Sequence, residues 1–162
     1  MSEQGFTALL VFYSLASTVH WILINQKRLK MGPNSAELVR VFTRQTGAVI
    51  ADITFPYNLA FEAIIDCEAG AAIHDTGAKY EIKINVIDFS TMRSIVRSAI
   101  VAAGSLGDAG WPKQAQQFMF PLPAPGALNE GHICKLFASL KVGIANPYAS
   151  LAESPLFLIT SP

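Results

Sequence analysis

Charged side chains are scarce in this sequence, and no region of it is strongly basic. Asp, Glu, Lys and Arg make up 15% of the residues, against about 25% in typical soluble domains, while hydrophobic residues make up 51%. Twelve basic residues balance twelve acidic ones, and the densest basic cluster, Gln26–Lys30, is small. The composition therefore excludes nucleic acid as a partner. It also predicts that the apolar excess is either buried or faces a partner or a membrane.

Cysteine and histidine are scarce as well. Cys67 and Cys134 are too few for a disulfide scaffold and do not have C-x-x-C spacing. His20, His74 and His132 lie far apart, which predicts no metal site. A phosphate-binding loop, a dinucleotide fingerprint and a serine nucleophile elbow are all missing from the sequence. We therefore expect neither a cofactor nor a metal, and the sequence favours a non-enzymatic function.

The amino-terminal segment from Gly5 to Asn25 has no charged residue and is long enough to span a membrane. Its aromatic and β-branched residues are also typical of strands, which we place at 6–13 and 19–27 with a turn between them. We favour these strands over a buried helix or a membrane helix. Residues 1–47 are then an amino-terminal extension of a single domain, 1–162, packed on or between subunits. We expect no cleavable signal peptide, because no basic residue precedes the apolar run. The sequence does not indicate a compartment.

The beginning of this segment, Gly5-Phe6-Thr7 followed by a hydrophobic run, resembles the amino terminus of type IV pilins and archaeal flagellins. The resemblance implies a helix that packs into a filament. Those proteins carry a glutamate soon after the cleavage point, and Leu10 stands at that place here. This departure favours the strand interpretation, with membrane or filament contact by residues 5–25 as the alternative.

Downstream, three stretches alternate between apolar and polar residues, which predicts half-buried strands at 59–69, 80–89 and 132–142. A shift of one residue would turn the polar set into the core, so the inward face of each strand is well defined. Shorter strands are predicted at 49–55, 117–122 and 156–160.

Two stretches have helical spacing instead. Asn34 can cap a helix that carries Leu38, Val41 and Phe42 and stops at Gly47. Ser90 can cap a second helix over residues 92–103, although residues 95–99 would also suit a bent strand.

Residues 104–131 are rich in glycine and proline and are expected to cross the surface as a long connection. Pro121, Pro123 and Pro125 would restrict any strand within it to a sheet edge. Trp111 is predicted either as an interface anchor or as a plug at the end of the fold.

About eight short strands predict a mainly β fold, a two-layer antiparallel sandwich of immunoglobulin-like or jelly-roll-like type with one or two short helices. From about residue 48 the pattern resembles an immunoglobulin-like sandwich, because Cys67 and Cys134 both face inward on long strands. Tyr80 and His132 replace the tryptophan and the corner tyrosine of that fold. The resemblance implies a cross-sheet disulfide. Two buried free thiols are the alternative that we favour.

The motif Ile73–Ala78 contains Asp75, Thr76 and Gly77 and resembles the Asp-Thr-Gly-Ala signature of retropepsin-like aspartic proteases. That resemblance implies a dimer in which two aspartates share one proton. His74 departs from the family, which has a hydrophobic residue before the aspartate. The alternative is a tight hairpin turn with glycine at positive φ.

The sequence thus predicts a non-enzymatic structural or interaction protein that associates with itself. The alternatives are the dimeric protease and a barrel that encloses a small apolar ligand, as a carrier or a cyclase. The predicted interface residues are Phe6, Phe12, Trp21 and Trp111.

Overall fold

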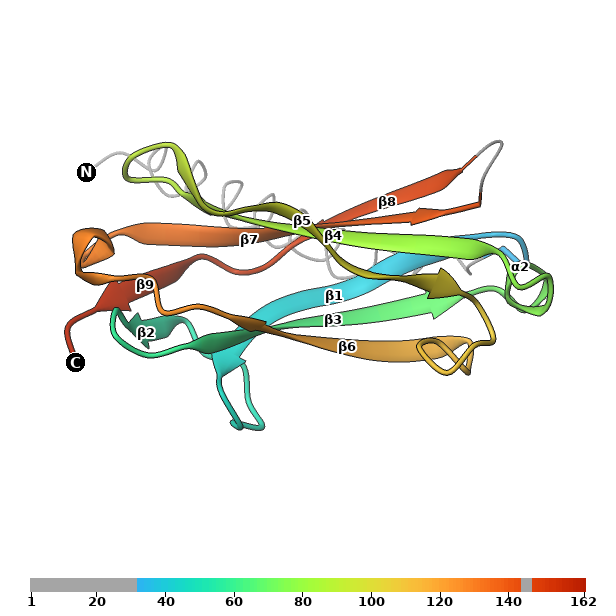
Figure 1. The fold of residues 1–162 in the computed structure, drawn as a ribbon, viewed down its shortest axis with the longest axis horizontal. Helices are drawn as coiled ribbons and strands as arrows, with labels where there is room; N and C mark the ends of the chain where they lie inside the picture. The colour runs from blue at the N-terminus through green and yellow to red at the C-terminus, as the bar shows by residue number, and fades with distance from the viewer. Residues whose placement is uncertain (1–31, 144–146) are drawn as a thin grey trace, which may run out of the picture. The chain divides into compact units, whose positions relative to one another are not determined.

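The computed structural model describes residues 32–143 and 147–162, and within them the protein is mainly β. A three-stranded sheet has the order β1-β3-β6, and a six-stranded sheet has the order β2-β9-β7-β4-β5 with β8 also paired to β7 (Figure 1). The predicted β-sandwich of two packed sheets is confirmed. The elements are β1 (Ala36–Gln45), β2 (Thr54–Pro56), β3 (Phe61–Ala69), α2 (Ala71–Asp75), β4 (Lys79–Asp88), β5 (Arg93–Ser105), β6 (Ala115–Leu122), η1 (Ala127–Asn129), β7 (Ile133–Val142), β8 (Tyr148–Glu153) and β9 (Phe157–Thr160).

All strand pairs are antiparallel except β2 with β9, which is parallel. None of the helices in residues 32–143 and 147–162 has the length and apolar character needed to cross a membrane. The predicted strands at 6–13 and 19–27 lie outside the described residues.

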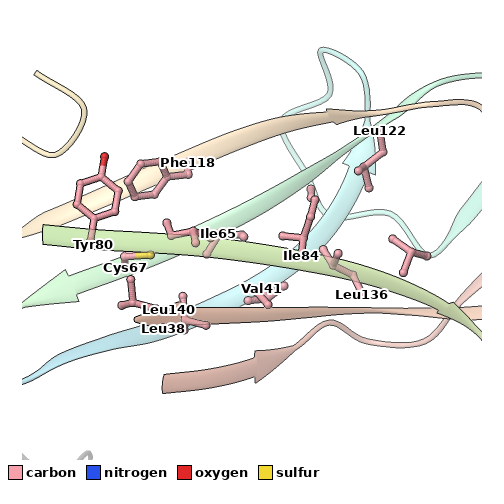
Figure 2. Packing of buried hydrophobic residues seen from close by; sticks show 14 of the residues in the cluster. Leu38, Val41, Ile65, Cys67, Tyr80, Ile84, Phe118, Leu122, Leu136 and Leu140 are labelled. Carbon is pink, nitrogen blue, oxygen red and sulfur yellow. The ribbon is translucent and has the colours of Figure 1, made fainter. Parts of the chain in front are cut away.

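The core lies between the two sheets and contains the predicted inward sets of β3, β4 and β7 together with residues of β1 and β6 (Figure 2). Every second residue of these strands is buried, as the alternation requires. Each large aliphatic side chain buried in this way stabilises the fold by about 1.5–3 kcal/mol. The long predicted strands and their facing are therefore confirmed, except that β3 begins at Phe61 and Leu59, predicted to face inward, is exposed.

The helix predicted from Asn34 is wrong, because this segment forms β1 and pairs with β3. A β-bulge between Leu38 and Arg40 leaves one extra residue, so Leu38 and Val41 both face the core although they are three residues apart. The bulge thus imitates the spacing of a helix. Residues 36–45 accordingly belong to the sandwich, whereas the sequence predicted that the extension continues to residue 47.

The helix predicted from Ser90 is also wrong, and the alternative of a bent strand is confirmed. Residues 93–105 form β5, which pairs with β4 through three register irregularities. Each irregularity changes which residues of β5 face inward. The apolar residues of this strand therefore do not alternate regularly with polar ones.

The connection from residue 104 to 131 contains β6, an edge strand of the three-stranded sheet. Pro121 lies within β6, so the restriction of proline to an edge is confirmed. The tight hairpin predicted at residues 75–77 is wrong, because β3 and β4 belong to different sheets and α2 joins them. Gly77 nevertheless adopts the predicted positive φ, 64°.

Candidate interaction surface

Four apolar side chains are exposed together on the outer face of the six-stranded sheet. Leu158 of β9 pairs with Ile133 of β7, and the Phe89 amide donates to the Ile133 carbonyl at 2.8 Å. Leu156 lies two residues before Leu158. Their exposed fractions are 38% for Leu158, 45% for Ile133, 42% for Phe89 and 52% for Leu156. We refer to these four residues as the outer-face row.

The outer face of the three-stranded sheet differs on its central strand, because ion pairs of the chain itself flank the apolar residue Ile64 there. Arg40 Nε lies 2.8 Å from Asp66, and Arg44 Nε lies 2.7 Å from Glu62. Ile64 alternates with these two carboxylates on β3 and is fully buried. The outer-face row has no such cover among the described residues.

A polar cluster around the buried side chain of Asp88 holds the backbone next to the outer-face row. The side chain of Asp88 is 2% exposed and lies 2.9 Å from His132 Nδ1. It also accepts hydrogen bonds from the Ser90 amide at 2.8 Å and from the Thr91 amide and hydroxyl. The Ile133 amide donates to Ser90 Oγ at 3.0 Å. The cluster thus ties the β4–β5 turn to the beginning of β7, which positions Ile133.

The carboxylate of Asp88 is ionised in this setting. Burial alone would raise its pKa, but the Thr91 hydroxyl, the Ser90 amide and His132 together lower the pKa below its ordinary value. An ionised carboxylate can only accept, so His132 Nδ1 is the donor in their hydrogen bond. Burial, with the charge of Asp88 as a second cause, raises the pKa of the neighbouring Cys134 thiol to about 12.

The polar cluster borders a hollow of about 390 Å³ whose wall includes Arg93 and Asn129. Chemically, an aspartate and a histidine in contact can exchange a proton. A nucleophilic triad would need a hydroxyl on the other nitrogen of His132, whereas the Thr91 hydroxyl donates to Asp88 instead. The geometry of the Asp88 cluster therefore favours a structural role, in which it connects two segments of the chain, over a role in hydrolysis.

A second apolar feature lies in the loop between β1 and β2, which projects from the sandwich (Figure 1). Its end consists of Ala48–Ala51, which we call the apolar tip. Val49 is 91% exposed and Ile50 is 79% exposed. Exposed neighbouring aliphatic side chains on a projecting loop are typical of a contact with a partner.

The base of this loop is held by Asp52. The Asp52 amide donates to the Thr43 carbonyl at 2.9 Å, and the Thr43 hydroxyl donates back to the Asp52 carbonyl at 3.1 Å. The Asp52 carboxylate accepts from the Gln45 side-chain amide at 3.0 Å and from the Thr54 backbone amide at 3.1 Å. Gly47 makes the turn at a φ of 79°. The tip is therefore presented by an ordered loop.

Beside the loop base is a hollow of about 360 Å³, which we call the base hollow. It is lined by Gln45, Thr46, Phe55, Pro56, Leu59 and Ala60. None of these residues is charged, and Leu59 is 54% exposed.

The predicted catalytic residues lie in and after α2. The Asp75 side chain is 79% exposed and is 3.6 Å from His74 Nδ1. The Thr76 hydroxyl donates to the Ile73 carbonyl at 2.7 Å, which closes the turn before Gly77. A carboxylate in open water lacks the burial that favours a shared proton, so the protease assignment stays a prediction without support from this geometry.

Trp111, predicted as an interface anchor or a plug, is fully buried. Its ring packs edge-on against Tyr80 at 5.1 Å and against Phe118 at 5.6 Å between centroids. The position thus fits the plug at the end of the sandwich. The other predicted interface residues, Phe6, Phe12 and Trp21, lie outside the described residues.

The two cysteines are free and buried on opposite sheets, which confirms the favoured alternative. Cys67 lies beside Tyr80 (Figure 2), whereas Cys134 pairs with Asp88. Tyr80 and Asp88 lie at opposite ends of β4, about 26 Å apart in an extended strand. A disulfide would need the two Cα atoms within about 7 Å of each other.

In the part of the chain that the structure describes, no three His, Cys, Asp or Glu side chains converge as a metal site would require. No protein-family model matches the sequence, and no curated protein is similar to it. The function is therefore argued from the geometry.

Sequence reasoning missed the outer-face row, the apolar tip and the polar cluster. Val49 and Ile50 were predicted as the beginning of a strand at 49–55, of which residues 54 and 55 are in β2. Gly47 and Asp52, two turn-forming residues on either side of a short apolar run, are the signal that could have revealed a loop. The Asp88–His132 contact joins residues 44 positions apart, and no local spacing predicts it.

Proposed function

We propose that this protein is a non-enzymatic β-sandwich that acts by self-association, as a structural or interaction subunit. The outer-face row is the observation that carries the proposal. Half-exposed aliphatic and aromatic side chains of this size gain about 1 kcal/mol each when they are fully covered. The same row on two copies contributes eight such side chains, which is comparable to the cost of association, about 4–15 kcal/mol.

Charge supports the same proposal. The chain has equal numbers of acidic and basic residues, so two copies do not repel each other at long range. Lys135, next to the outer-face row on β7, is paired with Glu153 at 2.6 Å. The row can therefore be covered without leaving this lysine unpaired.

We further propose that the sandwich is of the immunoglobulin-like type, with a jelly-roll-like type as the alternative. The support is the placement of Cys67 and Cys134 on long strands of opposite sheets, both buried. A crystal structure with the strands of Cys67 and Cys134 in the same sheet would contradict this assignment.

Size-exclusion chromatography with light scattering tests self-association on the full chain. We expect a mass that is a multiple of 17.5 kDa at micromolar concentration, and a stable monomer would contradict the proposal. The combined variant Ile133→Thr and Leu158→Thr keeps β-forming residues and should weaken the assembly. Leu151→Thr is the matched control, because Leu151 is 82% exposed on β8, outside the outer-face row.

A further inference from the structure

We propose that the apolar tip docks into the base hollow of a second copy of this chain, which places its own tip into the base hollow of the first. This inference rests on the proposed self-association and names its contact. A two-fold contact of this kind uses the same patch on both copies. The tip and the base hollow are two halves of one patch, because Gln45 and Thr46 of the hollow lead directly into the loop.

The two halves match in chemistry. Ala48–Ala51 contains no polar side chain, and the base hollow is lined by Phe55, Pro56 and Leu59 among its uncharged residues. Covering Val49 and Ile50 removes two neighbouring, strongly exposed aliphatic side chains from water. The hydrogen bonds at Asp52 already order the loop, so docking costs little additional conformational entropy.

The chain that leads out of the tip passes directly to the outer-face row. Beyond Asp52 it reaches Ile53, which is 57% exposed. The Ile53 carbonyl accepts a hydrogen bond from the amide of Leu158, a member of the row, at 2.8 Å. Ile53 and Leu158 therefore place exposed apolar side chains on neighbouring segments close to the loop. Together with the tip they can contribute to the area that a stable dimer needs, about 800 Å² on each partner.

A second copy fits the tip better than a lipid surface does. Loops that bind anionic membranes carry basic residues beside their apolar ones. Along the chain, the charged residue nearest to the tip is Asp52, which is acidic. Arg44, the nearest basic residue along the chain, is paired with Glu62 at 2.7 Å, with its side chain 15% exposed.

The test compares the full chain with the double variant Val49→Ser and Ile50→Ser by sedimentation velocity over a dilution series. We expect the double variant to weaken dimerisation on the order of a hundredfold, because two buried side chains are lost from each copy. At a concentration low enough for both proteins to be monomeric, thermal unfolding should be the same, since both side chains are exposed in one copy. Leu128→Ser, at a residue that is 94% exposed on η1, is the matched control and should assemble like the parent.

The outcomes separate the two proposals. A monomeric parent would overturn self-association together with the docking. A parent that assembles, with a double variant that assembles equally well, would overturn the docking alone. Flotation with phosphatidylcholine vesicles is a second arm: binding by the parent that the double variant loses, with unchanged assembly, would assign the tip to lipid and overturn the inference.

Cross-linking provides an independent measurement. The single variants Val49→Cys and Leu59→Cys, mixed under oxidising conditions, should form a cross-linked product more readily than either variant alone. The native cysteines do not interfere, because Cys67 and Cys134 are buried and their thiol pKa values are raised to about 12. A mixture that forms no more product than the separate variants would contradict the docking.

Discussion

His132, directly before β7, donates a hydrogen bond of 2.9 Å to the buried carboxylate of Asp88 at the end of β4. The contact joins two strands of the six-stranded sheet where β4 turns toward β5. It therefore holds in place the edge of the surface that we propose for association.

Asp88→Asn should destabilise the fold. The substitution removes the buried charge that accepts from Ser90, Thr91 and His132, and the loss of such charge-assisted hydrogen bonds costs about 1–3 kcal/mol. Urea unfolding followed by fluorescence measures the change. Asp75→Asn is the control, because Asp75 is 79% exposed and its replacement should stay within about 0.5 kcal/mol. Equal effects of the two variants would refute the structural role of Asp88.

The Asp88 carboxylate should also make the free energy of unfolding depend on pH in the acid range. The pKa of Asp88 is lowered in the folded state, so the unfolded chain binds the proton more readily. The stabilisation is complete above the unfolded pKa, about 4, and is lost as the pH falls through the folded value. Urea midpoints should therefore fall between about pH 5 and pH 3 by more in the parent than in Asp88→Asn. Identical pH profiles would rule this contribution out.

Both native thiols should be inert in the folded protein. Burial, with the charge of Asp66 as a second cause, raises the pKa of Cys67 to about 12, and Cys134 is raised to the same value. We expect no reaction with a disulfide reagent at pH 8 until the chain unfolds, and then two thiols per chain. Because the unfolded thiols ionise first, stability should decrease as the pH rises above about 9. Rapid labelling of the native protein would contradict the buried placement.

Gly70→Ala should be costly although Gly70 has ordinary backbone angles. A Cβ at this position would lie 2.4 Å from the Gly32 carbonyl oxygen and 2.5 Å from that of Pro33, and backbone atoms cannot move aside cheaply. We expect a loss of about 1–3 kcal/mol by thermal or urea unfolding. Gly32→Ala is the control, since its Cβ would meet nothing closer than Ser35 Oγ at 3.6 Å. A Gly70 variant as stable as this control would disprove the close contact.

The regular strands could be predicted from the sequence because alternation survives wherever the register is uninterrupted, as in β3, β4 and β7. The prediction failed where bulges break the period: Leu38 and Val41 face the same way across a bulge and imitate a helix. The partial prediction of β2 has another cause, since Val49 and Ile50 form an apolar run that is exposed and not part of a strand.

The site could be predicted only in its chemical class. Low charge and high apolarity indicated association, but the outer-face row combines Ile133 of β7 and Leu158 of β9 with residues directly after β4 and directly before β9. Long-range contacts bring these segments together. Leu158 and Ile133 meet only when β9 returns to β7. No spacing within the sequence encodes that meeting.

Self-association is tested most directly by the mass of the full chain in solution, measured by sedimentation equilibrium at micromolar concentration. We expect a mass that is a whole multiple, two or more, of 17.5 kDa, decreasing in the Val49→Ser and Ile50→Ser variant. A parent that remains at 17.5 kDa throughout the concentration range would contradict the account.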